Sequence, residues 1–309
     1  MIKKSIELSG RTLTLETGRL AKQAGGSVLV TYGETVVLVA STASQGIDEY
    51  RGFFPLTVDY REKFYASGKI PGGFFRREAR PSEQEIIGAR LTDRPLRPLF
   101  PDGFYNETHI FINVLSFDGE NNGNILGTLG ASASLAISDI PWDGPVASIT
   151  VGRISGELII NPTNTQLEES DLEIIISGTK ESVVMVEGEA KFISEEDFLT
   201  IIQYGHEAIK DLVQLQEELV KECGKTKREV MEPEVNEDLI HAVNKLIEGK
   251  ISDLNTPTNK LERYENIRHF KEGIVEQLQV EYPDDIELIK SYIEDEISNE
   301  YQAKITGFP

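Results

Sequence analysis

The sequence predicts an α+β domain followed by an all-helical domain. With 309 residues the chain is longer than one compact core usually requires, so we expect two domains. Strand and helix patterns alternate irregularly up to about residue 190, which favours α+β over a regular parallel array. Beyond residue 194 every pattern is helical. The charged segment 226–236 contains Pro233 and is typical of a linker, which gives predicted domains of 1–228 and 236–309.

The first domain contains several segments typical of strands. Residues 27–32 and 34–42 are rich in Val, Leu and Thr and join at Tyr32-Gly33, which predicts a β-hairpin. Residues 56–64 and 108–117 alternate apolar and polar side chains, as half-buried strands do. We expect further strands at 146–151, 158–160, 172–177 and 183–187.

Two helices are predicted between these strands. The first begins at Ser82, where Glu85 three residues later completes a capping box, and it should end near Arg94 because Pro95 follows. The second covers 125–137. Its Gly and Ala residues make a surface small enough to lie close against a sheet: Gly127, Gly130, Ala131, Ala133 and Ala136.

The remaining helices follow the last predicted strand. Ser194 and Asp197 form a second predicted capping box, and apolar residues recur at helical spacing from there to Gly224, a predicted C-cap. Three more helices are predicted at 239–247, 258–278 and 286–305.

Composition is that of an ordinary globular protein, with 39% hydrophobic and 27% charged residues. The single cysteine, Cys223, cannot form an internal disulfide, which agrees with a reducing cytoplasmic setting. The basic residues of the N-terminus are followed at once by Glu7, Arg11 and Glu16 rather than by an apolar core, so no signal peptide is predicted. No apolar run approaches the ~20 residues that span a bilayer. We therefore expect a soluble cytoplasmic protein.

The net charge of −21 argues at first against a nucleic-acid partner. The charge is unevenly placed, however. Residues 191–309 carry 14 basic and 27 acidic side chains, whereas residues 61–97 carry nine basic and five acidic ones. A single basic segment in an acidic protein can attract RNA locally while the rest of the surface repels it.

The densest group of candidate site residues lies within residues 68–80, Gly-Lys-Ile-Pro-Gly-Gly-Phe-Phe-Arg-Arg-Glu-Ala-Arg. Phe74 and Phe75 offer faces for bases, and Arg76 and Arg77 can neutralise phosphates or stack. The alternative is that the phenylalanines are core residues and the arginines are solvated. Adjacent aromatic residues beside adjacent arginines in a Gly-rich loop are hard to bury together, which favours contact with single-stranded RNA.

Downstream, Arg90, Arg94 and Arg97 are spaced i, i+4, i+7. The first two share a helix face and, together with Arg80, can line a phosphate track. The alternative pairs these arginines with Glu83, Asp93 or acids of a neighbouring subunit, and spacing alone slightly favours this alternative.

Candidates for catalysis are few. The four histidines have no metal-ligand spacing, and common phosphate-binding, nucleophile and zinc motifs are absent from the sequence. Asp171 and Glu173 lie on one side of a predicted strand. Such a pair can hold Mg²⁺, although a bare Asp-x-Glu more often faces solvent.

Several motifs together resemble the first RNase PH domain of the bacterial polynucleotide phosphorylase family. They are Phe-Phe-Pro-Leu-Thr-Val-Asp-Tyr at 53–60, Gly-Gly-Phe-Phe-Arg-Arg-Glu at 72–78, Arg-Pro-Ser-Glu at 80–83 and Asp-Arg-Pro-Leu-Arg-Pro-Leu-Phe-Pro at 93–101. Shorter matches at 130–132, 178–179 and 185–187 continue into the helices. The resemblance therefore covers nearly the whole chain.

The resemblance implies a phosphate-dependent 3′-to-5′ exoribonuclease that releases nucleoside diphosphates with Mg²⁺ or Mn²⁺. Members of this family form homotrimeric rings, sometimes within larger RNA-degrading complexes, and each subunit has two RNase PH domains joined by a helical domain, with KH and OB-fold modules after them. The resemblance also implies that Phe74, Phe75, Arg76 and Arg77 grip RNA at the central channel. Arg80, Arg90 and Arg94 would face RNA on its way to the active site.

In this family catalysis belongs to the second RNase PH domain, so the resemblance implies that the present chain is the front half and lacks catalytic residues and metal ligands. Asn122-Gly123-Asn124 stands where the active half has phosphate-binding serines. Asp171 and Glu173 match two of three acids, and Leu167 lies near the place of the third. Two alternatives stay open: a stand-alone phosphorolytic enzyme like RNase PH, and a non-catalytic ring subunit of the exosome type.

Overall fold

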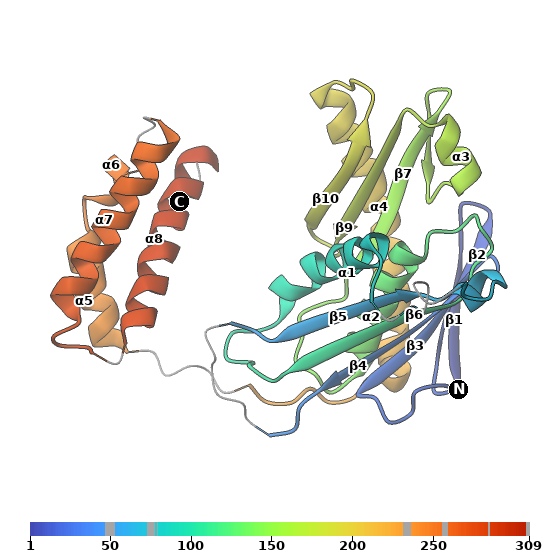
Figure 1. Cartoon of the computed structure of the whole chain (residues 1–309), viewed down its shortest axis with the longest axis horizontal. Helices are drawn as coiled ribbons and strands as arrows, with labels where there is room; N and C mark the ends of the chain where they lie inside the picture. The colour runs from blue at the N-terminus through green and yellow to red at the C-terminus, as the bar shows by residue number, and fades with distance from the viewer. Residues whose placement is uncertain are drawn as a thin grey trace. The chain divides into compact units, whose positions relative to one another are not determined.

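The computed structural model describes residues 1–46, 53–72, 78, 80–230, 236–254, 259–283 and 285–306. The chain divides into two compact units, Met1–Glu232 and Pro233–Pro309 (Figure 1). The first unit contains both sheets, and the described part of the second is helical. No helix among the described residues is long and apolar enough to cross a membrane.

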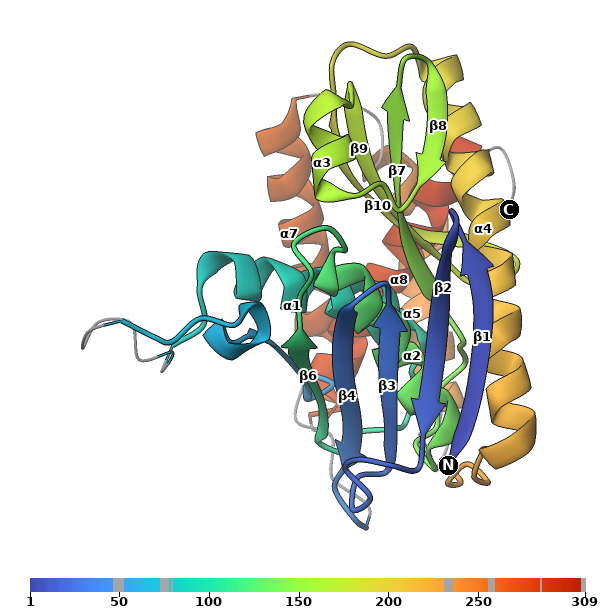
Figure 2. The same cartoon turned by 90° about the vertical axis from the view of Figure 1, so that its right-hand side faces the viewer.

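The larger sheet of the first unit has six strands in the order β1-β2-β3-β4-β6-β5. Figure 2 shows β1, β2, β3, β4 and β6 of this sheet side by side. All neighbours are antiparallel except β5 and β6, which are parallel. The predicted β3 to β6 are confirmed, whereas β1 and β2 are additional to the prediction. The strands are β1 (Ile2–Leu8), β2 (Arg11–Thr17), β3 (Gly26–Tyr32), β4 (Thr35–Ala43), β5 (Leu56–Glu62) and β6 (Thr108–Ser116).

The predicted hairpin is present between β3 and β4. Tyr32 pairs with Thr35, so Gly33 and Glu34 form a two-residue turn. Gly33 has a φ of +60°, a conformation that costs a glycine no steric penalty.

The second sheet has four antiparallel strands in the order β10-β9-β7-β8. All four were predicted from the sequence. They are β7 (Ala147–Ile154), β8 (Glu157–Ile160), β9 (Leu172–Gly178) and β10 (Val183–Ala190). The short helix α3 (Asn164–Glu169), which lies between β8 and β9 in the chain, was not predicted.

Helix α2 (Gly123–Ile137) packs against β3 and β4, as its small residues predicted. A Cβ atom added to Gly130 would lie 2.5 Å from Val39 Cγ2 and 2.8 Å from Val30 Cγ2. The missing side chain therefore permits the close approach of helix and sheet, and α2 is buried along almost its whole length.

Helix α1 (Glu83–Leu96) begins as predicted, with Ser82 and Glu85 in a reciprocal capping box. The predicted end near Arg94 is wrong, because the helix continues through Pro95 to Leu96. Proline removes one N–H donor from the last turn, and the helical hydrogen bonding resumes at Arg97, whose N–H donates to the Asp93 carbonyl. Both Pro95 and Leu96 are buried, so packing compensates for the one missing hydrogen bond. A 3₁₀ turn, η3 (Arg97–Leu99), follows.

Helix α4 (Glu195–Cys223) packs on the second sheet, on β1 and on α2. Fully buried Gln216 fixes it: its Oε1 accepts from Ser132 Oγ (2.6 Å) and its Nε2 donates to the Val146 carbonyl (2.9 Å). At the start of the helix Ser194 Oγ accepts from Asp197 N–H. The Asp197 carboxylate does not return the bond to Ser194 within the described structure, and lies 3.7 Å from Arg153 Nη1 instead. Only half of the predicted capping box therefore forms.

The second unit has a core of its own, formed mainly by isoleucine, leucine and valine side chains of four helices. The predicted helices are confirmed as α5 (Glu237–Ile247), α7 (Lys260–Leu278) and α8 (Ile286–Thr306), and a short α6 (Ile251–Leu254) is additional. The core residues are Leu239, Val243, Ile247, Ile251, Ile274, Leu278, Ile289, Ile293 and Ile297.

Candidate nucleic-acid interface

The loop predicted to grip RNA is anchored at its first residues. The 3₁₀ turn η1 (Phe64–Ser67) ends at Gly68, whose φ of +68° turns the chain back. The N–H of Gly68 donates to the Tyr65 carbonyl and that of Lys69 to the Phe64 carbonyl, both at 3.0 Å. Phe74, Phe75, Arg76 and Arg77 lie outside the described residues.

The far side of the same loop returns to the same turn at Glu78. Its carboxylate accepts a hydrogen bond from Phe64 N–H (2.6 Å) and lies 3.7 Å from Lys63 Nζ. The residues on either side of 73–77 are therefore tied to one short element at the end of β5, which fixes the two points from which the loop extends.

The three described arginines of the predicted RNA track have different surroundings. Arg80 and Arg90 are not buried, and neither has an ion pair within the described part of the chain. Arg94 is exposed as well, and it forms an ion pair with Glu187 of β10. The alternative in which these arginines pair with acids is confirmed for Arg97, whose partner Asp93 was among the acids named. For Arg94 the partner, Glu187, is an acid that the sequence analysis did not name.

Arg97 belongs to the scaffold. Its guanidinium donates to both carboxylate oxygens of Asp93 (3.0 and 2.7 Å) and to the carbonyls of Phe54 and Leu56 (3.0 and 3.1 Å). With its donors used in this way, Arg97 ties η3 to the start of β5.

Asp171, the first acid of the pair at the start of β9, is held by an arginine of the neighbouring strand. Arg153 on β7 donates from Nε to Asp171 Oδ1 (3.0 Å) and from Nη2 to Oδ2 (2.7 Å), a bidentate contact. The hydrogen bond from Arg153 lowers the pKa of the Asp171 carboxyl, although partial burial acts in the other direction. The negative charge of the Asp171 carboxylate is thus already balanced by the Arg153 guanidinium.

Glu173 lies in a different environment. It pairs directly across the strands with Glu189 of β10 and is half buried. Burial raises the pKa of the Glu173 carboxyl, and the charge of Glu189 raises it further. Both acids line a cavity of about 250 Å³ together with Asp171, Leu167 and Lys191.

The carboxylates of Asp171, Glu173 and Glu189 all line this cavity, but they are not placed together as ligands of one ion. The Asp171 carboxylate is bound by Arg153 and Leu167 offers no oxygen, whereas Mg²⁺ and Mn²⁺ need several oxygen ligands. The described residues contain no group of three or more His, Cys, Asp or Glu side chains placed to hold a metal ion.

The two asparagines at the start of α2 make structural contacts. Asn122 serves as its N-cap, accepting from Asn124 N–H at 2.8 Å. The Asn124 side chain packs toward α1, where its Oδ1 would meet a Cβ added to Gly88. Glu62, Lys63, Lys69 and Gly123 line one pocket of about 220 Å³, so the charges near this helix end are mixed.

Sequence reasoning missed Arg153, the residue that most changes the interpretation of Asp171. The two residues are 18 positions apart, and only the antiparallel register of β7 and β9 brings them together. A candidate strand pair was visible in the sequence, but its register was not.

The two sheets with α2 and α4 form an RNase PH-like fold. A solved structure of rice (Oryza sativa) Rrp46 matches it with a TM-score of 0.54 and 17% identity, covering 67% of this chain and 93% of that chain, a likeness that shows the fold. Residues 9–141 match domain 1 of the 3′ exoribonuclease family, and residues 144–208 match domain 2. The chain belongs to this 3′ exoribonuclease family.

Curated relatives specify the resemblance further. Proteins called polyribonucleotide nucleotidyltransferase from Heliobacterium modesticaldum and Geotalea uraniireducens are 47% and 46% identical over 94% and 95% of this chain. One from Thermomicrobium roseum is 53% identical over 76% of it. The chain spans 41%, 42% and 30% of the lengths of these three relatives. The predicted resemblance to the N-terminal portion of polynucleotide phosphorylase is confirmed.

Proposed function

We propose that this chain is the RNA-guiding N-terminal portion of a polyribonucleotide nucleotidyltransferase. The complete protein would degrade RNA from the 3′ end with inorganic phosphate, release nucleoside diphosphates, use Mg²⁺ or Mn²⁺, and work in the cytoplasm as a homotrimer. Similarity to curated relatives over 94% of the chain supports this proposal.

RNA guidance is assigned to the basic loop and the arginines that follow it. Phe74, Phe75, Arg76 and Arg77 would contact RNA from a loop whose two flanks are tied to η1. Exposed Arg80, which lacks an ion pair in the described structure, would continue the track. Arg90 and Arg94 would lie further along it, Arg94 after release from Glu187.

The same portion is proposed to be catalytically inactive. The observation that carries this is the bidentate Arg153–Asp171 contact, because a carboxylate whose two oxygens accept from one guanidinium is not free to bind a metal ion. Catalysis and metal binding would then belong to the other RNase PH domain of the complete protein. An exosome-type ring subunit would share this inactivity, but the likeness to Rrp46 at 17% identity supports the fold alone.

The guiding role is tested with Arg76→Ala and Arg77→Ala combined. Binding of a 20-nucleotide poly(A) oligomer should weaken, and the slope of log affinity against log salt should shrink by about 0.7 for each phosphate that the variant no longer neutralises. The matched control combines Arg19→Ala and Lys22→Ala, which remove the same charge from exposed positions of the same unit. Equal affinities and slopes in the two double variants would contradict the proposal.

A further inference from the structure

Strand β10 is an edge strand whose second half is exposed. It ends the four-stranded sheet, next to β9 (Figure 1). Its residues from Glu187 to Ala190 are all exposed, whereas Met185 is buried. The other edge strand of this sheet, β8, has only four residues, and Tyr204 of α4 donates to its Leu158 carbonyl (3.2 Å). The second half of β10 is therefore open to pairing with another chain.

The hydrogen bonding of β10 shows which of its backbone groups point outward. The Lys191 N–H donates to the Asp171 carbonyl (2.9 Å), and this pair continues the register of β10 and β9. Hydrogen-bonded residues alternate along an antiparallel strand, so the odd-numbered residues of β10 bond to β9. Because peptide units are planar, the N–H and C=O groups of Gly188 and Ala190 then point away from β9. Neither residue has a hydrogen-bond partner on that side among the described residues.

Little side-chain bulk shields this edge. A Cβ atom added to Gly188 would lie 2.1 Å from the Glu173 carbonyl oxygen, so only glycine fits beside β9 at this point. Ala190 carries a single methyl group. Two residues further on, Phe192 has a φ of +53° and a fully exposed ring. An exposed aromatic ring at the end of an open edge is suited to contact an apolar side chain of a bound chain.

The charges on one face of this edge are unbalanced. Glu189 lies directly opposite Glu173, and neither carboxylate has an ion pair within the part of the chain that the structure describes. Burial raises the pKa of the Glu173 carboxyl and the Glu189 charge raises it further, as expected for a pair that no cation compensates. Lys191 donates to a backbone carbonyl instead (3.4 Å). Because Asp171 is balanced by Arg153, two glutamates remain for one lysine, so the complementary group is a cation.

We propose that this edge binds a short extended segment of a partner protein, which adds to β10 as a further strand and carries a basic residue beside Glu189. The segment would pair its backbone with Gly188 and Ala190. Its Lys or Arg would lie about 4.5–5.5 Å from Glu189, Cβ to Cβ, on the acidic face, and an apolar residue would contact Phe192. The inference does not depend on the proposed RNA guidance, because none of these residues belongs to the basic loop or to the arginine track.

Two other occupants fit less well. A second copy of the chain that paired through the same edge would bring its own Glu187 and Glu189 beside these acids, in a protein with a net charge of −21. RNA would bring its phosphates toward the same glutamates, which repel them. A basic segment is the occupant that the local charge attracts.

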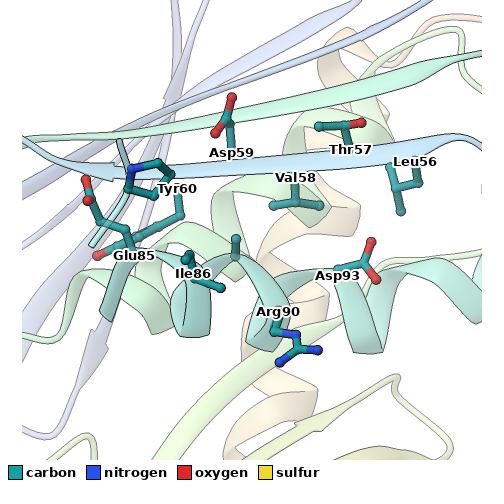
Figure 3. Close-up of a pocket in the computed structure, with 11 residues that line it drawn as sticks. Leu56, Thr57, Val58, Asp59, Tyr60, Glu85, Ile86, Arg90 and Asp93 are labelled. Carbon is teal, nitrogen blue, oxygen red and sulfur yellow. The ribbon is translucent and has the colours of Figure 1, made fainter. Parts of the chain in front are cut away.

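The edge strand of the larger sheet, β5, is a poorer site for an added strand. A pocket of about 350 Å³ lies between β5 and α1 (Figure 3), but Tyr60, at the centre of the strand, is only 1% exposed. At one end of the strand Arg97 already donates to the Leu56 carbonyl. At the other end the Glu62 N–H donates to Glu85. Little of β5 is left to pair with another chain.

A random heptapeptide library displayed on phage and selected against the immobilised chain tests the proposal. The selection uses about 0.15 M salt, which screens long-range attraction to the acidic chain. It should enrich sequences with a basic residue and a large apolar residue. A synthetic peptide of the most enriched sequence is then the probe. It should slow hydrogen exchange at the amides of Gly188 and Ala190, whereas the Glu189 amide, directed toward β9, should be unchanged.

Two exposed glutamates at opposite edges of the same sheet provide matched variants. Glu189 lies on β10 and Glu157 on β8. Glu189→Lys should weaken peptide binding at least about tenfold, while Glu157→Lys should leave it unchanged. Both changes reverse one charge, so a general attraction of basic peptides to the acidic chain would fall equally in both. Glu189→Lys also removes the like-charge pair with Glu173, so thermal unfolding should show no loss of stability.

Three results would overturn the proposal. They are a selection that enriches nothing over a blank surface, equal peptide binding by the two variants, and protection of amides elsewhere but not at Gly188 and Ala190. Protection of these two amides by an eight-nucleotide poly(A) probe, with no peptide enriched, would assign the edge to RNA. Their protection in the chain alone as its concentration rises would assign the edge to a second copy.

Discussion

Three arginines on and after α1 have the same charge and three different environments. Arg90 has no ion pair among the described residues, Arg94 pairs with Glu187, and Arg97 is fixed by Asp93 and two carbonyls. An ion pair between half-exposed groups such as Arg94 and Glu187 contributes only about 0–1 kcal/mol, so a phosphate can replace the glutamate. If the Arg97 guanidinium moved to bind a phosphate, the carbonyls of Phe54 and Leu56 and the Asp93 carboxylate would lose their donor. We therefore expect Arg97 to stay in place.

A second residue-scale consequence concerns Glu173, whose raised pKa makes its contribution to stability depend on pH. The folded state binds its proton more tightly than the unfolded state, where the ordinary value is 4.5. Its favourable contribution is therefore present below pH 4.5 and disappears as the pH rises through the raised folded-state pKa. Glu173→Gln should increase the free energy of unfolding at pH 7 by about 0.2–1 kcal/mol, since it removes a like-charge pair across the strands.

Urea unfolding at several pH values checks this. The gain from Glu173→Gln should shrink below pH 4.5, where the wild-type side chain is also neutral. Glu168→Gln, on α3, removes the same charge and should change stability little at any pH. A loss of stability at pH 7 in Glu173→Gln would mean that the carboxylate has a favourable partner.

The sequence was sufficient to single out the candidate residues, but of the pairs they form it named only the one between Asp93 and Arg97. Glycines, aromatic residues and arginines are concentrated in residues 68–80, so the loop could be found from composition alone. The partners Arg153 of Asp171, Glu189 of Glu173 and Glu187 of Arg94 each lie on another element. Strand register and helix placement bring them together, and neither can be derived from a single sequence.

At the scale of elements, two helical glycines have opposite roles. Gly130 of α2 allows close packing on Val30 and Val39, so Gly130→Ala should destabilise the first unit by about 1–3 kcal/mol through overpacking. Gly273 of α7 has no atom within 4 Å of an added Cβ, so Gly273→Ala should stabilise the second unit by about 1 kcal/mol through helix propensity. Thermal unfolding of both variants measures the two effects with the same chemical change. A gain in Gly130→Ala would show that the sheet can move away from α2.

Most elements could be predicted because their patterns are long and regular, as in β3, β4 and α4. The exceptions have physical causes. Helix α3 has six residues, too few for a helical period to show, and α1 passes Pro95 because the proline lies in its last turn and is buried. Strands β1 and β2 do alternate in sequence, but they begin the chain among charged residues, and only the burial of Leu13 and Leu15 shows which face meets the core.

At the scale of the whole molecule, the net charge of −21 opposes self-association. In the family that this chain resembles, the trimer contacts involve two RNase PH domains, and this chain matches the first of them. Sedimentation at micromolar concentration and about 0.1 M salt should therefore find mainly a species of 34.5 kDa. Repeating the run near 1 M salt controls for charge repulsion, which is then screened. A trimer that persists at every concentration would mean that the first RNase PH domain carries the ring contacts alone.

The last prediction is that this chain neither phosphorolyses RNA nor polymerises nucleoside diphosphates, even with saturating Mg²⁺ and phosphate. Phosphoryl transfer requires a positioned phosphate and a metal ion that stabilises the developing charge. Here Asn122 caps α2, Asn124 packs toward α1, and the Asp171 carboxylate is bound by Arg153. The residues at the position of the phosphate and at the position of the metal ion are thus both engaged in structural contacts.

Release of labelled nucleoside diphosphate from poly(A) is the assay. It should give no signal above a blank, and Asp171→Ala should behave identically, which controls for a contaminating enzyme. Arg153→Ala is the informative companion, because it frees the Asp171 carboxylate without supplying an acid at Leu167 or a phosphate site at α2; it should stay inactive as well. Turnover by the unaltered chain that disappears in Asp171→Ala would show that this RNase PH domain has a working active site, and that the Arg153 contact opens during catalysis.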